Sequence, residues 1–152
     1  MAKVKLGQVK KLREKTGAGV MEVRRALLEA GGDERKAIKI LKDKGFEKAA
    51  KKETRAVKAG IVASYIHHTL TSGATGVLQS ETDFVARNPE FQQLAHYIAV
   101  QGTAMAPADI PELLAQPFIK GTGETIGDLV NSTVQKFGER TEIGRIIRFS
   151  IK

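Results

Sequence analysis

The sequence of 152 residues contains no cysteine and no tryptophan, and aromatic residues make up only 5% of it. Without cysteine the chain has neither disulfides nor thiolate metal ligands, which suits a reducing compartment. So few aromatic side chains leave the core mostly aliphatic and offer little for the base-stacking platforms of single-strand binders. An apolar signal segment and a bilayer-length hydrophobic run are also missing. We therefore expect a soluble intracellular protein that has no membrane partner.

Positive charge is abundant, and it is concentrated in one part of the chain. The net charge is +8; residues 1–60 hold 18 Lys and Arg against 8 Asp and Glu, whereas residues 61–152 hold 7 against 9. The basic part predicts either nucleic acid or an acidic protein surface as a partner, and charge alone does not choose between them. The length predicts one domain, or one small domain with a helical appendage.

Periodic apolar residues predict three short helices at the N-terminus. The first covers residues 5–16 and ends at a glycine-rich turn, and the second runs from Val20 to Gly31 and Gly32. Asp33 caps the third helix, for which we expect Gly45 to be the stop. Between Phe46 and Lys58 the cations recur at three- and four-residue spacing. We interpret this run as the solvated face of a helix or linker, in preference to an RNA-binding stripe.

From Gly60 onward the pattern is that of a small α+β domain. Residues 61–69 predict a strand, residues 71–75 a turn and residues 76–80 the returning strand of a hairpin. Three helical segments are predicted after it, namely residues 89–101, a short turn at 112–116, and residues 125–138. A final strand closes a three-stranded antiparallel sheet, and its alternation predicts that three apolar side chains point inward: Ile147, Phe149 and Ile151.

The run Thr82-Asp83-Phe84-Val85-Ala86-Arg87-Asn88 places an acid and a large aromatic side by side before Pro89. It predicts a tight surface corner between a strand and a helix, with Thr82 capping a short helical turn. Spacing alone favours Phe84 as a core residue and Asp83 as a solvated cap over a projecting pair. Val20 and Met21 have two similar interpretations, a hydrophobic staple for the second helix or a docking patch, and the staple is favoured for Val20.

The sequence offers few motifs that indicate catalysis or a cofactor. Gly121-Thr122-Gly123 lacks the remaining spacing of a dinucleotide loop, and no phosphate loop with its lysine occurs. On a strand, His67 and His68 would point to opposite faces, and no third ligand is near them in the sequence. We therefore predict no metal site, no cofactor and no enzymatic activity.

Two long stretches resemble the elongation factor Ts family of bacterial and organellar translation factors. They are residues 12–27, which read LREKTGAGVMEVRRAL, and the run from Thr82 to Asn88. Residues 45–52 and 145–149 fit the same pattern, so the resemblance covers most of the chain. Relative to the family pattern the chain is shortened before Thr82 and lacks a helical stretch after Met105, as in a reduced form with one core subdomain.

The resemblance implies a ubiquitin-associated-like three-helix bundle over residues 1–54 and a core domain of the dimerisation type over residues 55–152. It further implies that the bundle docks on the GTPase domain of elongation factor Tu, in its GDP-bound and nucleotide-free forms. Binding would promote GDP release, in a bacterial cytoplasm or in an organelle matrix after loss of a targeting segment. The resemblance implies that no nucleic acid is required. Besides the complex with elongation factor Tu, short members of the family also imply a homodimer.

The family also implies roles for particular residues. Its Asp-Phe pair enters beside the magnesium and phosphate-binding region of the GTPase, and this nucleotide-release role carries over to Thr82, Asp83, Phe84 and Val85. N-terminal docking carries over to Leu12, Gly19, Val20 and Met21.

Two other functions remain open from the sequence. The charge of residues 1–60 motivates a basic RNA- or ribosome-associated protein, whose affinity would fall steeply with salt. The shortened core motivates an adaptor that binds the GTPase without exchanging its nucleotide.

Overall fold

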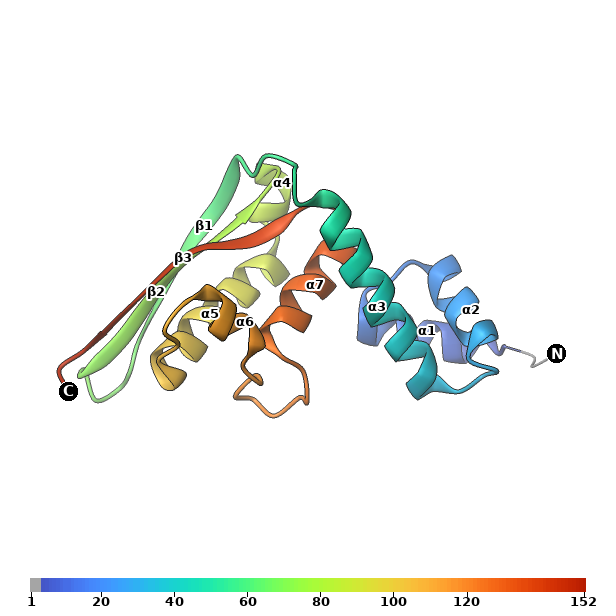
Figure 1. Cartoon of the computed structure of the whole chain (residues 1–152), viewed down its shortest axis with the longest axis horizontal. Helices are drawn as coiled ribbons and strands as arrows, with labels where there is room; N and C mark the ends of the chain where they lie inside the picture. The colour runs from blue at the N-terminus through green and yellow to red at the C-terminus, as the bar shows by residue number, and fades with distance from the viewer. Residues whose placement is uncertain (1–3) are drawn as a thin grey trace. The chain divides into compact units, whose positions relative to one another are not determined.

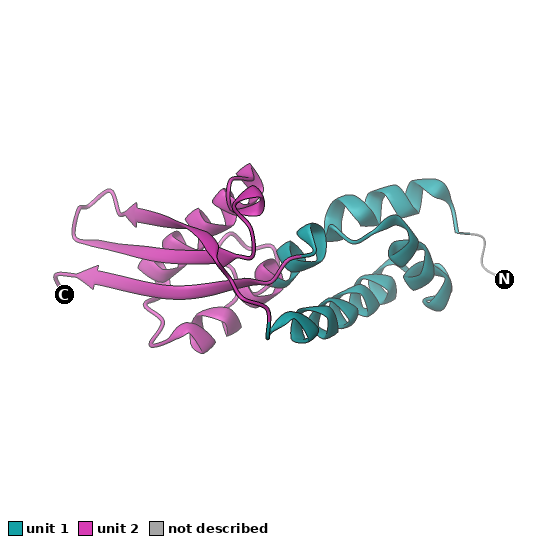
Figure 2. Ribbon diagram, turned by 90° about the horizontal axis from the view of Figure 1, so that it is seen from above, with its two compact units in different colours: residues 1–54, 131–138 teal, residues 55–130, 139–152 magenta. Residues whose placement is uncertain are grey.

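The computed structural model describes residues 4–152, which divide into two compact units (Figure 2). Unit 1 combines the chain up to Thr54 with residues 131–138, and unit 2 contains residues 55–130 and 139–152. These units are groupings by packing, and the division into functional domains at residue 54 stays a prediction. Across the described residues, no helix combines the length and the apolar character that crossing a membrane demands.

Unit 1 contains the three N-terminal helices that the sequence predicts: α1 (Leu6–Thr16), α2 (Val20–Glu29) and α3 (Glu34–Lys52). Gly17 ends α1 in the left-handed conformation, at φ 68°. Asp33 Oδ1 accepts hydrogen bonds from the backbone N–H groups of Arg35 and Lys36, at 2.9 and 3.1 Å, and so caps α3. The helices enclose an aliphatic core built from Val9, Leu12, Ala18, Val23, Ala26, Leu27, Ala37 and Leu41.

The prediction that α3 stops at Gly45 is wrong, because the helix continues to Lys52. Gly45 is buried where residues of α7 (Ile126–Phe137) approach the α3 backbone. A Cβ atom at Gly45 would lie 2.6 Å from Cδ of Gln135. Glycine at this position therefore permits close packing and does not mark a helix end.

Unit 2 is built on a three-stranded antiparallel sheet, as predicted, and the structure gives the strand order β1-β2-β3. The strands are β1 (Ala59–Ile66), β2 (Ser72–Ser80) and β3 (Thr141–Ser150). Helix α5 (Pro89–Met105) lies along one face of this sheet (Figure 1), and α4 (Asp83–Ala86) and α6 (Ile110–Ala115) are short. Leu78, Phe91 and Ile98 are among the completely or almost completely buried side chains of this core. The α+β fold class is therefore confirmed.

Two details of the sheet differ from the sequence prediction. The hairpin turn comes earlier than expected, so that β2 starts at Ser72, and His67 and His68 follow β1 with their ring centroids 4.2 Å apart. The prediction that the two histidines point to opposite faces of a strand is therefore wrong.

The inward direction predicted for the last strand is also wrong. Ile147 and Phe149 pair with Thr75 and Gly73, on the opposite face from Gly76, whose added Cβ would contact Ile98 of α5. Phe149 and Ile151 consequently remain 68% and 76% exposed. The pairing of β2 with β3 shifts register between Val77 and Leu78, and alternation within β3 alone carries no trace of that shift.

Candidate functional site

The candidate site is the corner between β2 and α5, and backbone geometry explains its shape. Thr82 is extended, at φ −125° and ψ 154°. Its carbonyl accepts from Ala86 N at 3.3 Å, and this hydrogen bond begins the single turn of α4. Asn88 then caps α5 by accepting from Glu90 N at 2.9 Å, and Pro89 follows, having no N–H to leave unpaired. The corner therefore has little freedom at either end.

Phe84 projects from this corner into solvent. Its side chain is 84% exposed, whereas Val85 and Ala86 are buried, with 3% and 1% exposure. In a single helical turn successive side chains are rotated by about 100°, so the two residues that anchor α4 leave Phe84 on the outer side. The favoured interpretation of Phe84 as a core residue is thus wrong. An exposed phenylalanine on a fixed turn is a feature typical of interaction sites.

Asp83 lies beside Phe84 and is also exposed. Its carboxylate pairs with Arg87 one helical turn later, at 2.9 Å, and such an exposed pair contributes little stability. Asp83 also lines a shallow hollow of about 400 Å³ together with Lys58, Gly60 and Gln79. The Asp83 carboxylate therefore borders this hollow and is next in sequence to the exposed ring of Phe84.

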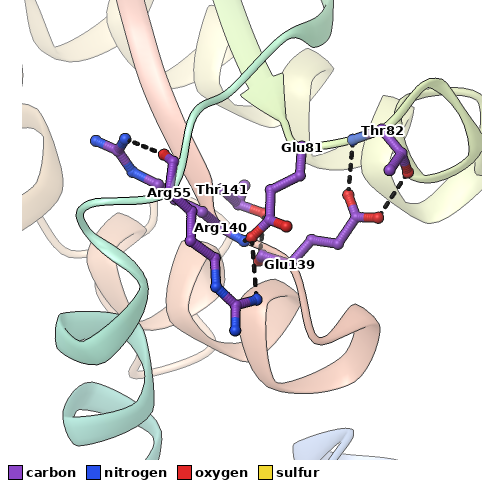
Figure 3. A network of polar contacts seen from close by, with 6 residues as sticks. All are labelled: Arg55, Glu81, Thr82, Glu139, Arg140 and Thr141. Atoms are coloured by element: carbon purple, nitrogen blue, oxygen red, sulfur yellow. Dashed lines mark hydrogen bonds and ion pairs between the residues drawn. The ribbon is translucent and has the colours of Figure 1, made fainter.

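The sequence predicted that Thr82 caps α4, but its side chain makes no capping hydrogen bond. Its hydroxyl donates instead to Glu139 Oε1 at 2.6 Å, and its backbone N–H donates to Glu139 Oε2 at 3.0 Å (Figure 3). Beside it, Glu81 Oε1 accepts from Arg140 N at 2.7 Å and from Arg55 Nη1 at 3.4 Å. Sequence reasoning missed these partners because 26 residues separate Arg55 from Glu81, while 57 and 59 residues separate Glu139 and Arg140 from their partners, and no local pattern marks such contacts.

The residues predicted for N-terminal docking lie in unit 1 and fall into two groups. Leu12 is completely buried in the bundle core, whereas Val20 and Met21 are 48% and 57% exposed at the start of α2. The two positions of a hydrophobic staple around Gly19 are occupied by Ala18 and Val23, which are both in the core. The staple interpretation of Val20 is therefore wrong, and Gly19, Val20 and Met21 form the surface part of the set.

Glu22 fixes the start of α2 next to this apolar pair. It accepts from Gly19 N at 3.3 Å and also forms an ion pair with Lys48 of α3. Partial burial lowers the pKa of Lys48, and the neighbouring charge of Lys52 lowers it further.

Known proteins resemble this chain over almost its whole length. The family model described as Elongation factor TS matches residues 81–152, which include the α4 corner. The chain is 36% identical to elongation factor Ts of Oleidesulfovibrio alaskensis, with 99% of each chain covered. It is 41% identical to elongation factor Ts of Thermodesulfovibrio yellowstonii over 94% of each chain, and 34% identical to that of Desulforamulus reducens over 99% of this chain and 90% of the relative.

Relatives of this kind place the chain among the translation elongation factors. The chain belongs to the elongation factor Ts family. Its alignment with the Oleidesulfovibrio relative extends over 196 positions, more than the 152 residues present here. The relative therefore has residues without a counterpart in this chain, as expected for a reduced form, while the two positions of the shortening stay predictions.

Proposed function

We propose that this protein is a guanine-nucleotide exchange factor that binds elongation factor Tu and promotes GDP release during translation elongation. The observation that carries the proposal is the exposed Phe84 on the fixed α4 corner, beside the carboxylate of Asp83. It acts by binding a protein and performs no covalent chemistry. Its site of action is the cytoplasm, where elongation takes place.

The proposed mechanism is displacement. A GTPase holds its nucleotide through Mg²⁺ and through backbone N–H groups that surround the phosphates. An apolar ring and a carboxylate inserted beside the phosphates displace the Mg²⁺ and the backbone N–H groups. The nucleotide then loses these contacts and dissociates. Burying an exposed phenylalanine on insertion contributes about 1.5–3 kcal/mol.

The remaining binding energy comes from a second contact. Val20 and Met21 are exposed apolar side chains at the start of α2, and Gly19 leaves the backbone next to them uncovered. We assign to this surface the docking on the GTPase domain. By linkage, a protein that weakens GDP binding is itself weakened by GDP to the same extent.

The experiment is the release rate of a fluorescent GDP analogue from elongation factor Tu of the same source, with and without this protein. The proposal predicts a large acceleration by the unmodified protein that is lost in Asp83→Ala and Phe84→Ala. Phe46→Ala, which removes an exposed phenylalanine of α3, is the matched control and retains activity. An unmodified protein that leaves the release rate unchanged contradicts the proposal.

The same experiment separates two alternatives. An adaptor binds elongation factor Tu without accelerating release. An RNA- or ribosome-associated protein, which the basic charge of residues 1–60 favours, binds RNA with an affinity that falls steeply with salt and depends on Lys48, Lys51 and Lys52.

We also propose a homodimer that forms through the open end of the sheet. Four exposed apolar residues, Ile66, Leu70, Phe149 and Ile151, line a hollow of about 310 Å³ there. Sedimentation equilibrium tests the dimer. Phe149→Ser shifts the protein to the monomer if this surface is the interface, and a monomeric unmodified protein contradicts the assignment.

A further inference from the structure

The ladder between β2 and β3 ends just before the α4 corner, and two carboxylates continue it. Its last paired residues are Ser80 and Thr141. The next opposed positions would be Glu81 with Arg140, and Thr82 with Glu139. There the side chain of Glu81 accepts from the backbone N–H of Arg140, and the side chain of Glu139 accepts from the backbone N–H of Thr82 (Figure 3). We call these four residues the carboxylate clamp.

Each polar group of Thr82 has a hydrogen-bond partner, and the clamp supplies the partner of two of them. Its N–H and its hydroxyl donate to the two oxygens of Glu139, at 3.0 and 2.6 Å. Its carbonyl accepts from Ser80 Oγ at 2.9 Å and from Ala86 N at 3.3 Å. Hydrogen bonds to a charged acceptor are stronger than those between neutral groups. Because every polar group of Thr82 has a partner, the direction in which the chain enters Asp83 and Phe84 is fixed.

The opposite side of the clamp is held by two arginines. Arg55 Nη1 lies 3.4 Å from Glu81 Oε1, and Arg140 Nη1 donates to the carbonyl of Arg55 at 2.6 Å. Arg140 Nη2 donates to Glu142 Oε2, also at 2.6 Å. These contacts tie the segment before β3 to the segment before β1, so Glu81 and Glu139 lie next to a braced end of the sheet.

Helix α4 needs such support because it has only four residues. Short helices are marginal in water, and their stability in proteins comes from tertiary contacts. The burial of Val85 and Ala86 supplies one anchor, and the hydrogen bonds to Thr82 supply another.

We infer that Glu139 is a positioning residue for nucleotide exchange, which acts through Thr82 to hold Phe84 in its projecting orientation. This inference rests on the proposed function. Glu139 acts on the corner and the docking surface lies elsewhere, so its loss changes the exchange step and leaves docking intact.

The test compares Glu139→Ala with Glu139→Gln in the release of a fluorescent GDP analogue at increasing concentrations of this protein. Glu139→Ala lowers the plateau rate by about ten- to a hundredfold, because Phe84 is no longer held in its projecting orientation, while the half-saturating concentration changes little. Glu139→Gln retains most of the rate, because its amide oxygen accepts from the Thr82 N–H and its NH₂ donates to the Thr82 hydroxyl. Glu124→Ala removes a carboxylate of the same unit outside the clamp and leaves the rate unchanged.

A second pair of variants examines the same contact from the other side, so the test does not depend on the folding of Glu139→Ala. Thr82→Val keeps the branched shape but has no hydroxyl to donate, and it lowers the plateau rate. Thr82→Ser keeps the hydroxyl and preserves the rate. Equal rates for valine and serine contradict the role assigned to the hydroxyl bond.

Amide hydrogen exchange in the free protein gives a readout that is independent of elongation factor Tu. The N–H groups of Ala86, Arg87 and Asn88 bond within the corner. They exchange faster in Glu139→Ala than in Glu139→Gln or the unmodified protein if the clamp orders the corner. Unchanged protection together with an unchanged plateau rate overturns the inference. If the unmodified protein does not accelerate GDP release, both the proposed function and the positioning role of Glu139 in it are wrong. Amide exchange then still decides whether the clamp orders the corner.

Discussion

Gly45 illustrates, at the scale of one residue, how a missing side chain determines packing. Gln135 Nε2 donates to the carbonyl of Leu41 at 2.9 Å, on the α3 surface that Gly45 leaves open. In the amide orientation that satisfies both of its polar atoms, Asn131 donates to Gly45 O and accepts from Phe46 N, both at 3.0 Å. Two polar side chains of α7 therefore bond to the α3 backbone where a larger residue would exclude them.

Gly45→Ala is expected to lower the free energy of unfolding by about 1–3 kcal/mol, because the added methyl group overpacks this contact. The loss is smaller in a Gln135→Ala background, where one of the displaced side chains is already absent. Urea unfolding of the unmodified protein, the two single variants and the double variant measures both effects.

Gly7→Ala is the matched control for this cycle. Gly7 also lies inside a helix, but an added Cβ there meets nothing within 4 Å. Alanine therefore stabilises the protein at Gly7, by about 0.4–1 kcal/mol. A Gly45→Ala protein that gains stability in the same way contradicts the packing role of Gly45.

Asp33 makes the stability of unit 1 depend on pH. The hydrogen bond from the Lys36 backbone N–H is the main reason that the pKa of Asp33 lies below its ordinary value of 3.8. Between the lowered and the ordinary pKa the unfolded chain binds more protons than the folded one. The stabilisation is therefore present above the ordinary pKa and is lost as the pH falls through the folded pKa.

The stability difference between the unmodified protein and Asp33→Asn isolates this titration, since asparagine also caps helices but does not ionise. Thermal unfolding from about pH 6 down to about pH 2.5 should show the difference declining in the acid range. A difference that stays constant with pH contradicts the assignment.

At the scale of elements, Gln101 of α5 anchors the segment that connects α6 to α7. This completely buried side chain donates from Nε2 to Pro117 O at 3.0 Å and accepts on Oε1 from Ile119 N at 3.0 Å. The connection between α6 and α7 is therefore fixed to α5 by one amide.

Gln101→Met should lower the free energy of unfolding by about 1–3 kcal/mol, because similar volume is retained while two backbone groups lose their partner. Gln93→Met, at an exposed position of the same helix, should have almost no effect. Urea unfolding distinguishes them, and equal stabilities for the two variants contradict the role of Gln101.

The sequence was informative about elements wherever the signal was local. Helical periodicity around Leu12, Val23 and Leu41 predicted the bundle, and two successive strand-like runs predicted the hairpin, although its turn lies earlier than the predicted turn residues. The outward direction of Phe84 was not predictable from spacing, since it depends on Val85 and Ala86 taking the inner side of a single turn. The contact of Glu139 with Thr82 was also not predictable, because the two residues are distant in the sequence and only the fold brings them together.

At the scale of the whole molecule, the two units carry different parts of the proposed activity. Unit 1 is basic and presents Val20 and Met21, whereas unit 2 presents Asp83 and Phe84 on a corner held by Glu139. A division of this kind predicts that docking and exchange can be impaired separately. Variants of the first surface alter the concentration dependence, and variants of the corner alter the maximal rate.

The most direct test of the account is the plateau rate of GDP-analogue release from elongation factor Tu at saturating concentrations of the unmodified protein and of Phe84→Ala. We predict that Phe84→Ala still saturates, through the docking surface of unit 1, but reaches a plateau at least about tenfold lower. A plateau for Phe84→Ala equal to that of the unmodified protein would show that the α4 corner does not drive nucleotide release.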